Sequence, residues 1–323
     1  MAEWLYEEGI GENRAILIEQ GQIAEAVIEL PGRLRSGSVA AARLAAILVA
    51  GRRGIAITPD GTEVLIEPVP GGATEGSAVR VEILREPIPE PGRPKRAKGR
   101  ITDAPERAGP SLRERLGAAA ASPPPGSDLF EQAGWSELLE EAATGEIAFA
   151  GGALRMSLTP AMTLFDVDGV LAPPALAEAG AAASGRAIRR LGITGSIGID
   201  LPTLPSREDR QKAAAALDAV LPQPFERTAV NGFGFLQVVR RRERPSLAEI
   251  VREDPVGAAA RALLRRAERS GGRGGRTLHA APEVIARLEP WADILARRMG
   301  TRIALQPEPG LAISAGHVHS QFP

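Results

Sequence analysis

Hydrophobic and polar positions alternate over short distances in the first part of the chain. Two apolar segments within residues 14–30 flank Gln20 and Gly21 and predict a β-hairpin. Four more follow within residues 38–88, separated by turn sequences rich in glycine and proline, and this spacing predicts a small β-barrel. The first of the four, residues 38–48, is rich in alanine, so a helix is an alternative there.

The second half of the chain alternates between strand and helix patterns. Helices are predicted at 128–143, at 173–192 behind a proline start, and at 206–221, where Ser206 is a capping residue. Strand patterns at 146–169, 193–204 and 227–242 lie between them, which is the order of an α/β sheet. An arginine-rich helix at 256–269, a helix at 282–299 and a strand at 302–309 then predict a small α+β unit. Residues 89–127, rich in proline, glycine and charge, predict a linker with a short helix at 112–121.

Charge is unevenly distributed along the chain. The formal net charge of −1 over 323 residues gives no sign of a nucleic-acid binder, and the length suggests about two domains. However, Arg240–Arg276 holds 11 arginines against 5 acidic residues, and residues 92–100 form a second basic run. Because local patches decide polyanion binding, these two segments are the candidates for contact with nucleic acid.

Several classes of protein are excluded by what the sequence lacks. There is no cysteine, which rules out disulfides, thiol catalysis and cysteine zinc sites. No apolar segment reaches the roughly 18 residues of a membrane helix and no signal-peptide pattern is seen, so we expect a cytoplasmic protein. His317 and His319 suggest either a metal pair or a mobile tail, and His279 is expected to be structural.

Three aspartates stand at the ends of apolar strands. Asp166 and Asp168 are two residues apart in "TLFDVDGV", so they share one face of a strand, and Asp200 ends the next strand, "SIGID". Ligand sites in α/β sheets gather at the carboxyl ends of strands, and Mg²⁺ prefers such oxygen ligands. The alternative interpretation is that these residues are ordinary turn formers.

The segment "LFDVDGVL" also resembles the first motif of haloacid-dehalogenase-type phosphatases. That resemblance implies that Asp166 is a phosphorylated nucleophile and Asp168 a general acid. The rest of that family's pattern is missing, because "GIDLPT" offers a single carboxylate where an acidic pair is needed. The only downstream lysine, Lys212, lies in an amphipathic helix.

A second resemblance covers most of the chain and follows one order throughout. "ENRAILIEQGQIAEAVIE" resembles the opening hairpin of the ribonuclease E/G family, and residues 38–88 resemble its OB-type RNA-binding barrel. "GGALRMSLTPAMTLFDVDG", "LGITGSIGIDLPTL" and "NGFGFLQVVRRRERPSL" are similar to its catalytic strands, and residues 282–309 to its small domain. The resemblance implies a multidomain α+β and α/β fold. Its parts are a hairpin packing on the catalytic core (1–37), the barrel (38–88), the linker (89–127), an α/β catalytic domain with a mixed sheet (128–247) and a small α+β domain (248–323).

The same resemblance implies a role for each site residue. Asp166 and Asp200 would hold a catalytic Mg²⁺, and Asp168 stands where the family usually has asparagine. Phe233 would contact single-stranded RNA near the scissile phosphate. The backbone of the RNA would follow a basic track of arginines: Arg240, Arg241, Arg242 and Arg244.

These roles predict a Mg²⁺-dependent endoribonuclease that cleaves single-stranded RNA to leave a 5′-phosphate and a 3′-hydroxyl. The chain departs from the family in three ways: it lacks the cysteine zinc link, it has no room for the 5′-end sensor, and its barrel segment has no aromatic residue. An RNA-binding protein with weak or no cleavage activity is therefore the alternative. Any homo-oligomer is expected to form through the C-terminal region by packing alone.

Overall fold

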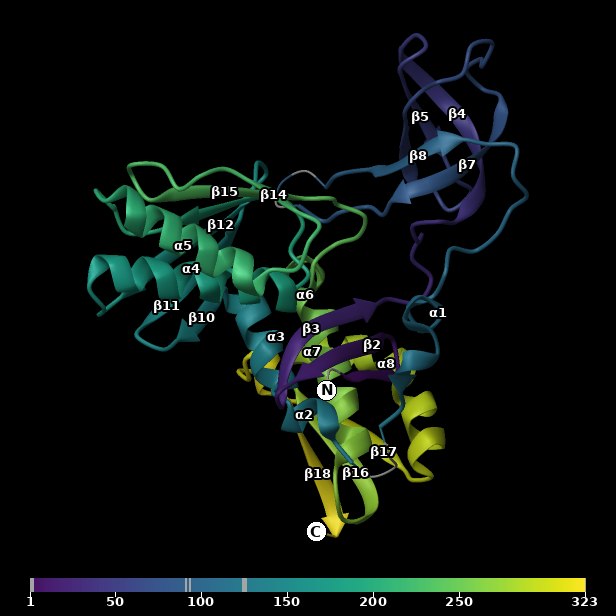
Figure 1. Ribbon diagram of the computed structural model, residues 1–323. Coiled ribbons are helices and arrows are strands. Elements are labelled where there is room, and N and C mark those ends of the chain that lie inside the picture. Colours follow the sequence, from purple (N-terminus) through teal and green to yellow (C-terminus); the bar gives the residue numbers. More distant parts are fainter. Residues whose placement is uncertain (1–2, 91, 93, 124–126, 323) are drawn as a thin grey trace. The chain divides into compact units, whose positions relative to one another are not determined.

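The computed structural model describes residues 3–90, 92, 94–123 and 127–322. Within these residues the fold is mixed α+β, with a closed five-stranded barrel and three further sheets (Figure 1). The chain divides into two compact units, one built from Met1–Pro31, Ala118–Leu139 and Val251–Pro323 and the other from Gly32–Gly117 and Glu140–Ile250. None of the helices in the described ranges is both long and apolar enough to cross a membrane.

The barrel belongs to the second unit. It consists of β4 (Val39–Val49), β5 (Arg53–Ile57), β6 (Glu63–Ile66), β7 (Ala78–Arg85) and β8 (Ala97–Ile101), which close in the order β4-β5-β6-β8-β7. The alanine-rich segment is a strand and not a helix, because Leu44 and its neighbours fill the interior together with Val64 and Val81.

The last barrel strand was predicted to be linker, and that prediction is wrong for residues 97–101. Gly99 sits where a Cβ atom would lie 2.6 Å from Val81 Cγ1 and 2.7 Å from the carbonyl oxygen of Glu82, so the barrel closes around a residue without a side chain. The predicted short helix is α1 (Leu112–Leu116), followed by η1 (Gly117–Ala119) and β9 (Ala120–Ala121). Residues 91, 93 and 124–126 of the predicted linker lie outside the described residues.

The second unit also contains a six-stranded mixed sheet. Its strands are β10 (Glu146–Phe149), β11 (Gly152–Leu158), β12 (Thr163–Gly169), β13 (Gly195–Asp200), β14 (Glu226–Arg227) and β15 (Phe235–Arg240), in the order β10-β11-β12-β13-β15-β14. Strands β12 and β13 are parallel, and the other neighbours pair antiparallel.

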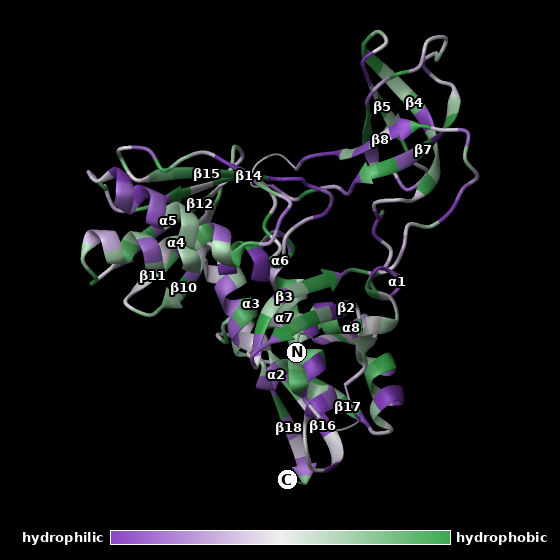
Figure 2. Ribbon diagram, viewed as in Figure 1, coloured by the Kyte–Doolittle hydropathy of each residue, from purple (hydrophilic) through white to green (hydrophobic). Residues whose placement is uncertain are grey.

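Two helices cover one face of this sheet. Helix α4 (Pro173–Arg190) packs on the strands, and α5 (Arg207–Val220) packs on α4; both carry hydrophilic and hydrophobic residues, as amphipathic helices do (Figures 1 and 2). Gly180 allows close packing, because a Cβ there would lie 2.4 Å from Val167 Cγ1. Phe165 and Ile199 are fully buried beneath the helices, so residues one position away on each strand face the opposite, open side.

The first unit contains segments from both ends of the chain. The predicted hairpin around Gln20 and Gly21 is β2 (Asn13–Glu19) with β3 (Gln22–Glu29), in a sheet of order β3-β2-β1-β9 with β1 (Glu3–Glu8). The predicted helix 128–143 is two helices, α2 (Leu129–Gln132) and α3 (Trp135–Thr144), because Gly134 adopts a φ of 93° between them. Helix α3 and α6 (Leu247–Glu253) contain the boundaries between the two units.

The C-terminal part of this unit is a three-stranded sheet with two helices. Strands β16 (Arg273–Ala280), β17 (Ile303–Pro307) and β18 (His317–Phe322) run in the order β17-β16-β18, next to α7 (Pro255–Arg269), α8 (Pro282–Met299) and η2 (Ile313–Ala315). One of the two expectations for the segment with His317 and His319 was a mobile tail. The structure instead places these residues in strand β18. The hairpin shares this unit with α7 and α8, and Arg261 Nε donates to Glu12 Oε2 at 3.0 Å.

Candidate functional site

Asp166 and Asp200 are direct neighbours across the sheet. The parallel pairing of β12 with β13 ends with Asp166 opposite Asp200. Because Phe165 and Ile199 point into the core, both aspartate side chains lie on the open face, on strands about 4.8 Å apart. Both residues are exposed. The two predicted metal ligands therefore share one face at the carboxyl ends of adjacent strands.

Arg155 lies beside these carboxylates and was not singled out by the sequence. Arg155 lies on β11, where it stands opposite Asp166 of β12 on one side and opposite Glu146 of β10 on the other. The guanidinium lies 3.6 Å from Glu146 Oε1 and 3.9 Å from Asp168 Oδ2, with all three side chains more than 60% exposed. Ion pairs at such exposure contribute about 0–1 kcal/mol, so Arg155 can be displaced by a cation or turned towards a phosphate.

The open face beside the aspartates is apolar. Phe235 stands opposite Asp200 on β15. A Cβ at Gly198 would lie 2.6 Å from Phe235 Cζ and 2.7 Å from Leu164 Cδ2, so the two side chains meet over the glycine. The site thus combines a hydrophobic floor with carboxylates along one edge.

A rigid loop presents Phe233 to solvent at the same end of the sheet. The side-chain oxygen of Asn231 accepts hydrogen bonds from the backbone N–H groups of Phe233 at 2.9 Å and Phe235 at 3.0 Å. Gly234, at φ 94°, passes so close to Leu201 that a Cβ would lie 2.2 Å from its carbonyl oxygen. The ring of Phe233 is nevertheless 83% exposed. A fixed backbone with an unburied aromatic ring is suited to stacking on a flat ligand.

The four predicted RNA-binding arginines lie at the other end of the sheet. Strand β15 begins with Phe235 opposite Asp200 and ends with Arg240 opposite Gly195, five residues or about 17 Å away. Arg240 Nη1 donates to the carbonyl oxygen of Ile193 at 3.1 Å. Arg241 and Arg244 are exposed, and Arg241 pairs with Glu243 at 3.1 Å on the surface.

Arg242 belongs to an internal network of ion pairs. Its Nη1 donates to Glu90 Oε1 at 2.7 Å and its Nη2 to Glu249, and the side chain is 16% exposed. Glu249 also accepts from the backbone N–H of Ser246 at 2.7 Å, which fixes the start of α6. Because Arg242 is engaged in these internal ion pairs, it is poorly placed to bind an RNA phosphate.

The two basic segments are largely neutralised by nearby carboxylates. In the run 92–100 the pairs are Lys95–Glu90, Arg96–Glu63, Lys98–Glu67 and Arg100–Glu82. Hydrogen bonds from Lys98 and Arg53 lower the pKa of Glu67 to about 2. Within Arg240–Arg276 the side chains of Arg261, Arg265 and Arg276 are buried, so the sequence excess does not become a continuous basic surface.

A polar pocket of about 160 Å³ lies around the Arg242 network. Arg85, Glu90 and Lys95 line it together with Arg242 and the turn between β11 and β12. Burial and the nearby Arg242 lower the pKa of Arg85. The pocket lies at the end of the sheet away from Asp200, since Gly195 and Ser196 at the start of β13 form part of its wall.

A metal-binding pair of His317 and His319 was one of two expectations for these residues. The structure instead groups His317 with residues of other segments. Among the described residues, one group of three potential metal ligands has donor atoms that all lie within 4.8 Å of one another: His279, Glu308 and His317. The three aspartates of the open face do not form such a group. Any cation there would be held by fewer protein ligands and more solvent or substrate oxygens.

No protein-family model matches the chain, and no curated protein is significantly similar to it.

Proposed function

We propose that the chain is a Mg²⁺-dependent endoribonuclease of the ribonuclease E/G type that acts on single-stranded RNA. The observation that carries the proposal is the pairing of Asp166 with Asp200 on one open sheet face. Mg²⁺ is usually held by one or two carboxylates plus water and substrate phosphate oxygens, so two aspartates on adjacent strands fit it without a third ligand. A Mg²⁺ ion held there supplies neutralisation of the developing charge and activation of a water.

The surrounding residues fit a nucleic-acid strand. Phe233 offers an exposed ring for stacking a base beside the scissile phosphate. Arg155 stands within reach of the same phosphate and neutralises part of the negative charge of the aspartates. We further infer that the five-stranded barrel is of OB type, because its order β4-β5-β6-β8-β7 is that of a Greek-key barrel whose last two strands are exchanged.

The deciding experiment uses a labelled single-stranded RNA and the purified full chain, with Mg²⁺ and with EDTA. We expect internal cleavage that requires the metal and leaves 5′-phosphate ends. Release of phosphate from a small phosphomonoester without RNA cleavage would instead support the haloacid-dehalogenase resemblance.

RNA binding without cleavage is the second candidate, and one observation favours it. The guanidinium of Arg155 lies 3.6 Å from Glu146 Oε1 and 3.9 Å from Asp168 Oδ2, so it places a positive charge beside the proposed metal site. If the guanidinium group of Arg155 takes the place of the metal ion, the same assay should show a stable RNA complex and no cleavage products at any Mg²⁺ concentration.

The exposed ring of Phe233 leads to a first prediction. Phe233→Ala is expected to weaken single-stranded RNA binding by about 1–3 kcal/mol, the contribution of one stacked base. Fluorescence anisotropy of a labelled RNA measures this change. The melting temperature should stay unchanged, because the ring is 83% exposed. Phe322→Ala is the matched control, since Phe322 is the other strongly exposed phenylalanine among the described residues, at 58%. Equal losses for both variants would refute the role of Phe233.

The arginines give a second prediction, which separates binding from structure. Arg241→Ala is expected to flatten the dependence of log affinity on log salt by about 0.7, the value of one phosphate contact on a single strand. Arg242→Ala should leave this slope unchanged and destabilise the fold by roughly 3 kcal/mol, because Glu90 and Glu249 lose a buried partner. Salt titrations and thermal melts on both variants measure the two quantities.

The control for this pair is Arg186→Ala, which removes an exposed arginine from α4 on the covered side of the sheet. It should change neither the slope nor the melting temperature. A stably folded Arg241→Ala variant with the wild-type slope would show that RNA does not follow this end of the sheet.

A further inference from the structure

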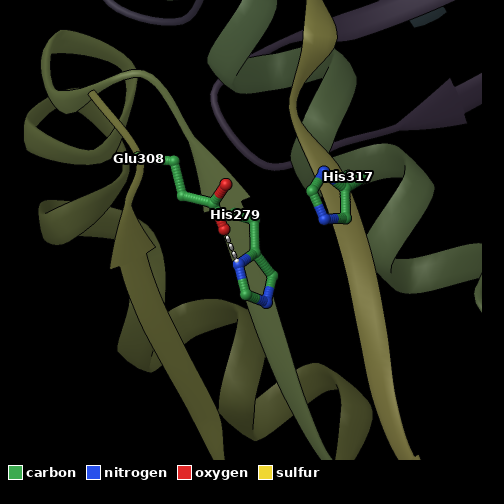
Figure 3. A group of neighbouring side chains, drawn as sticks. All are labelled: His279, Glu308 and His317. Carbon is green, nitrogen blue, oxygen red and sulfur yellow. Dashed lines mark hydrogen bonds and ion pairs between the residues drawn. The ribbon is translucent and has the colours of Figure 1, made fainter. Parts of the chain in front are cut away.

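Three strands of the C-terminal sheet bring metal-ligating side chains to one place. His279 on β16 is the register partner of His317 on β18. Glu308 follows β17 directly, and its backbone N–H donates to the carbonyl oxygen of Ala280 at 2.8 Å. Leu278 and Ala280 are buried in the core with α7 and α8, so His279 between them projects from the opposite face of the strand. Figure 3 shows the three side chains directed into the same space.

The geometry is close to that of a three-ligand metal site. The three donor atoms all lie within 4.8 Å of one another. His279 Nδ1 is 2.5 Å from Glu308 Oε1 (Figure 3), and the rings of His279 and His317 are stacked with centroids 4.8 Å apart and planes at 2°. Two imidazoles and one carboxylate are one of the ligand sets of four-coordinate zinc sites in which three ligands come from the protein and the fourth is water.

One small rearrangement completes the coordination. A metal ion lies in the plane of each imidazole that binds it, so two parallel rings cannot both bind until one of them turns. His317 is exposed, His279 is 22% exposed, and rotation of an imidazole about its second side-chain torsion is soft.

We propose that His279, Glu308 and His317 bind one Zn²⁺ ion. The ion joins the central strand β16 to β18 and to the segment after β17, and it therefore fastens the C-terminal strand to the sheet. The site is independent of the proposed RNA chemistry, because it uses none of the residues on the open face of the six-stranded sheet. The absence of cysteine excludes thiolate zinc sites but leaves this one.

The histidine content of the chain makes the test direct. There are three histidines in all, so the NMR spectrum contains three imidazole Cε1–H resonances, one for each residue, which single His→Gln variants assign. Zinc added to the untagged, chelator-treated full chain is expected to shift the resonances of His279 and His317 at one equivalent. His319 lies on β18, as His317 does, and pairs with Thr277 on β16. Its resonance should not shift.

Calorimetric zinc titrations of the variants give the quantitative test. His279→Gln and His317→Gln should each lower the affinity at least tenfold, and Glu308→Gln should do so by about 10–100-fold. His319→Gln is the matched control and should bind as the wild type does. Zinc should raise the melting temperature of the wild type and of His319→Gln, and not that of His317→Gln. Metal-free melts of each variant show whether it is folded.

Three results would overturn the proposal: no saturable zinc binding, joint shifts of His317 and His319 without His279, or an equal loss of affinity in His319→Gln and His317→Gln. Should His279→Gln fail to fold, His317→Gln at an exposed residue and Glu308→Gln at a half-buried one still decide the question.

Discussion

Replacing Asp166 or Asp200 with asparagine is expected to lower the rate of RNA cleavage by about a thousandfold or more. A carboxylate-held Mg²⁺ contributes several kcal/mol to charge stabilisation in the transition state, and each 1.36 kcal/mol corresponds to a factor of ten. Because the two residues are register partners on one open face, either substitution removes half of the protein ligands. Single-turnover cleavage of a labelled RNA at saturating Mg²⁺ measures the effect.

Binding must be measured on the same variants. Both aspartates are exposed and are proposed to hold the ion, so RNA affinity and melting temperature should remain close to those of the wild type. Asp293→Asn, an exposed aspartate on α8, is the control and should cleave normally. Cleavage that persists in Asp166→Asn and Asp200→Asn would exclude this pair as the metal site.

Asp168→Asn distinguishes the neighbouring carboxylate. It places at this position the residue usual in the family that the sequence resembles, and it removes the 3.9 Å ion pair with Arg155. We expect cleavage to continue in this variant. A loss as large as that in Asp166→Asn would instead make Asp168 a ligand.

The sequence predicted the site strands well because their signals are local. The apolar runs of β12 and β13 assigned Asp166 and Asp200 to the ends of successive strands, and the structure pairs these two strands directly. Arg155 was accessible by the same reasoning: counting outward from the four-residue turn 159–162 pairs Leu158 with Thr163 and hence Arg155 with Asp166.

Other features depend on contacts that the sequence does not encode locally. Strand β8 lies in a proline-rich and basic segment, and its identity comes from Gly99 fitting against Val81 across the barrel. Likewise, His279 and His317 meet only because strands nearly forty residues apart pair with each other. Arg242 and Arg261 pair with Glu90 and Glu12, which lie far from them in the sequence, so these partners follow from the tertiary fold alone.

A buried arginine near the N-terminus connects much of the first unit. Arg14 is 1% exposed, its Nε donates to Glu7 Oε2 at 3.0 Å and its Nη1 to Glu12 Oε1 at 2.9 Å. The guanidinium also lies 5.7 Å from the ring centre of Phe130 and 5.9 Å from that of Trp135. Burial by itself would raise the pKa of Glu7, but Arg14 and Arg269 outweigh it and lower that pKa below its ordinary value of 4.5.

Arg14→Met is therefore expected to destabilise the protein by about 3–5 kcal/mol at neutral pH, because it leaves buried carboxylates short of a partner. This corresponds to a drop in melting temperature of roughly 6–20 °C.

A carboxylate whose pKa is lower in the folded state than in the unfolded state stabilises the fold when the pH is above the unfolded-state pKa. That contribution is lost as the pH falls through the folded-state pKa. The penalty of Arg14→Met should accordingly shrink as the pH falls below 4.5, the ordinary value, towards the lowered pKa of Glu7 in the wild type. Arg297→Met, an exposed arginine on α8, is the control and should change stability by no more than about 0.5 kcal/mol. Denaturant titrations from pH 7 down to pH 4 measure both effects. A pH-independent penalty would show that Arg14 stabilises the unit through packing on Phe130 and Trp135 and not through its charge.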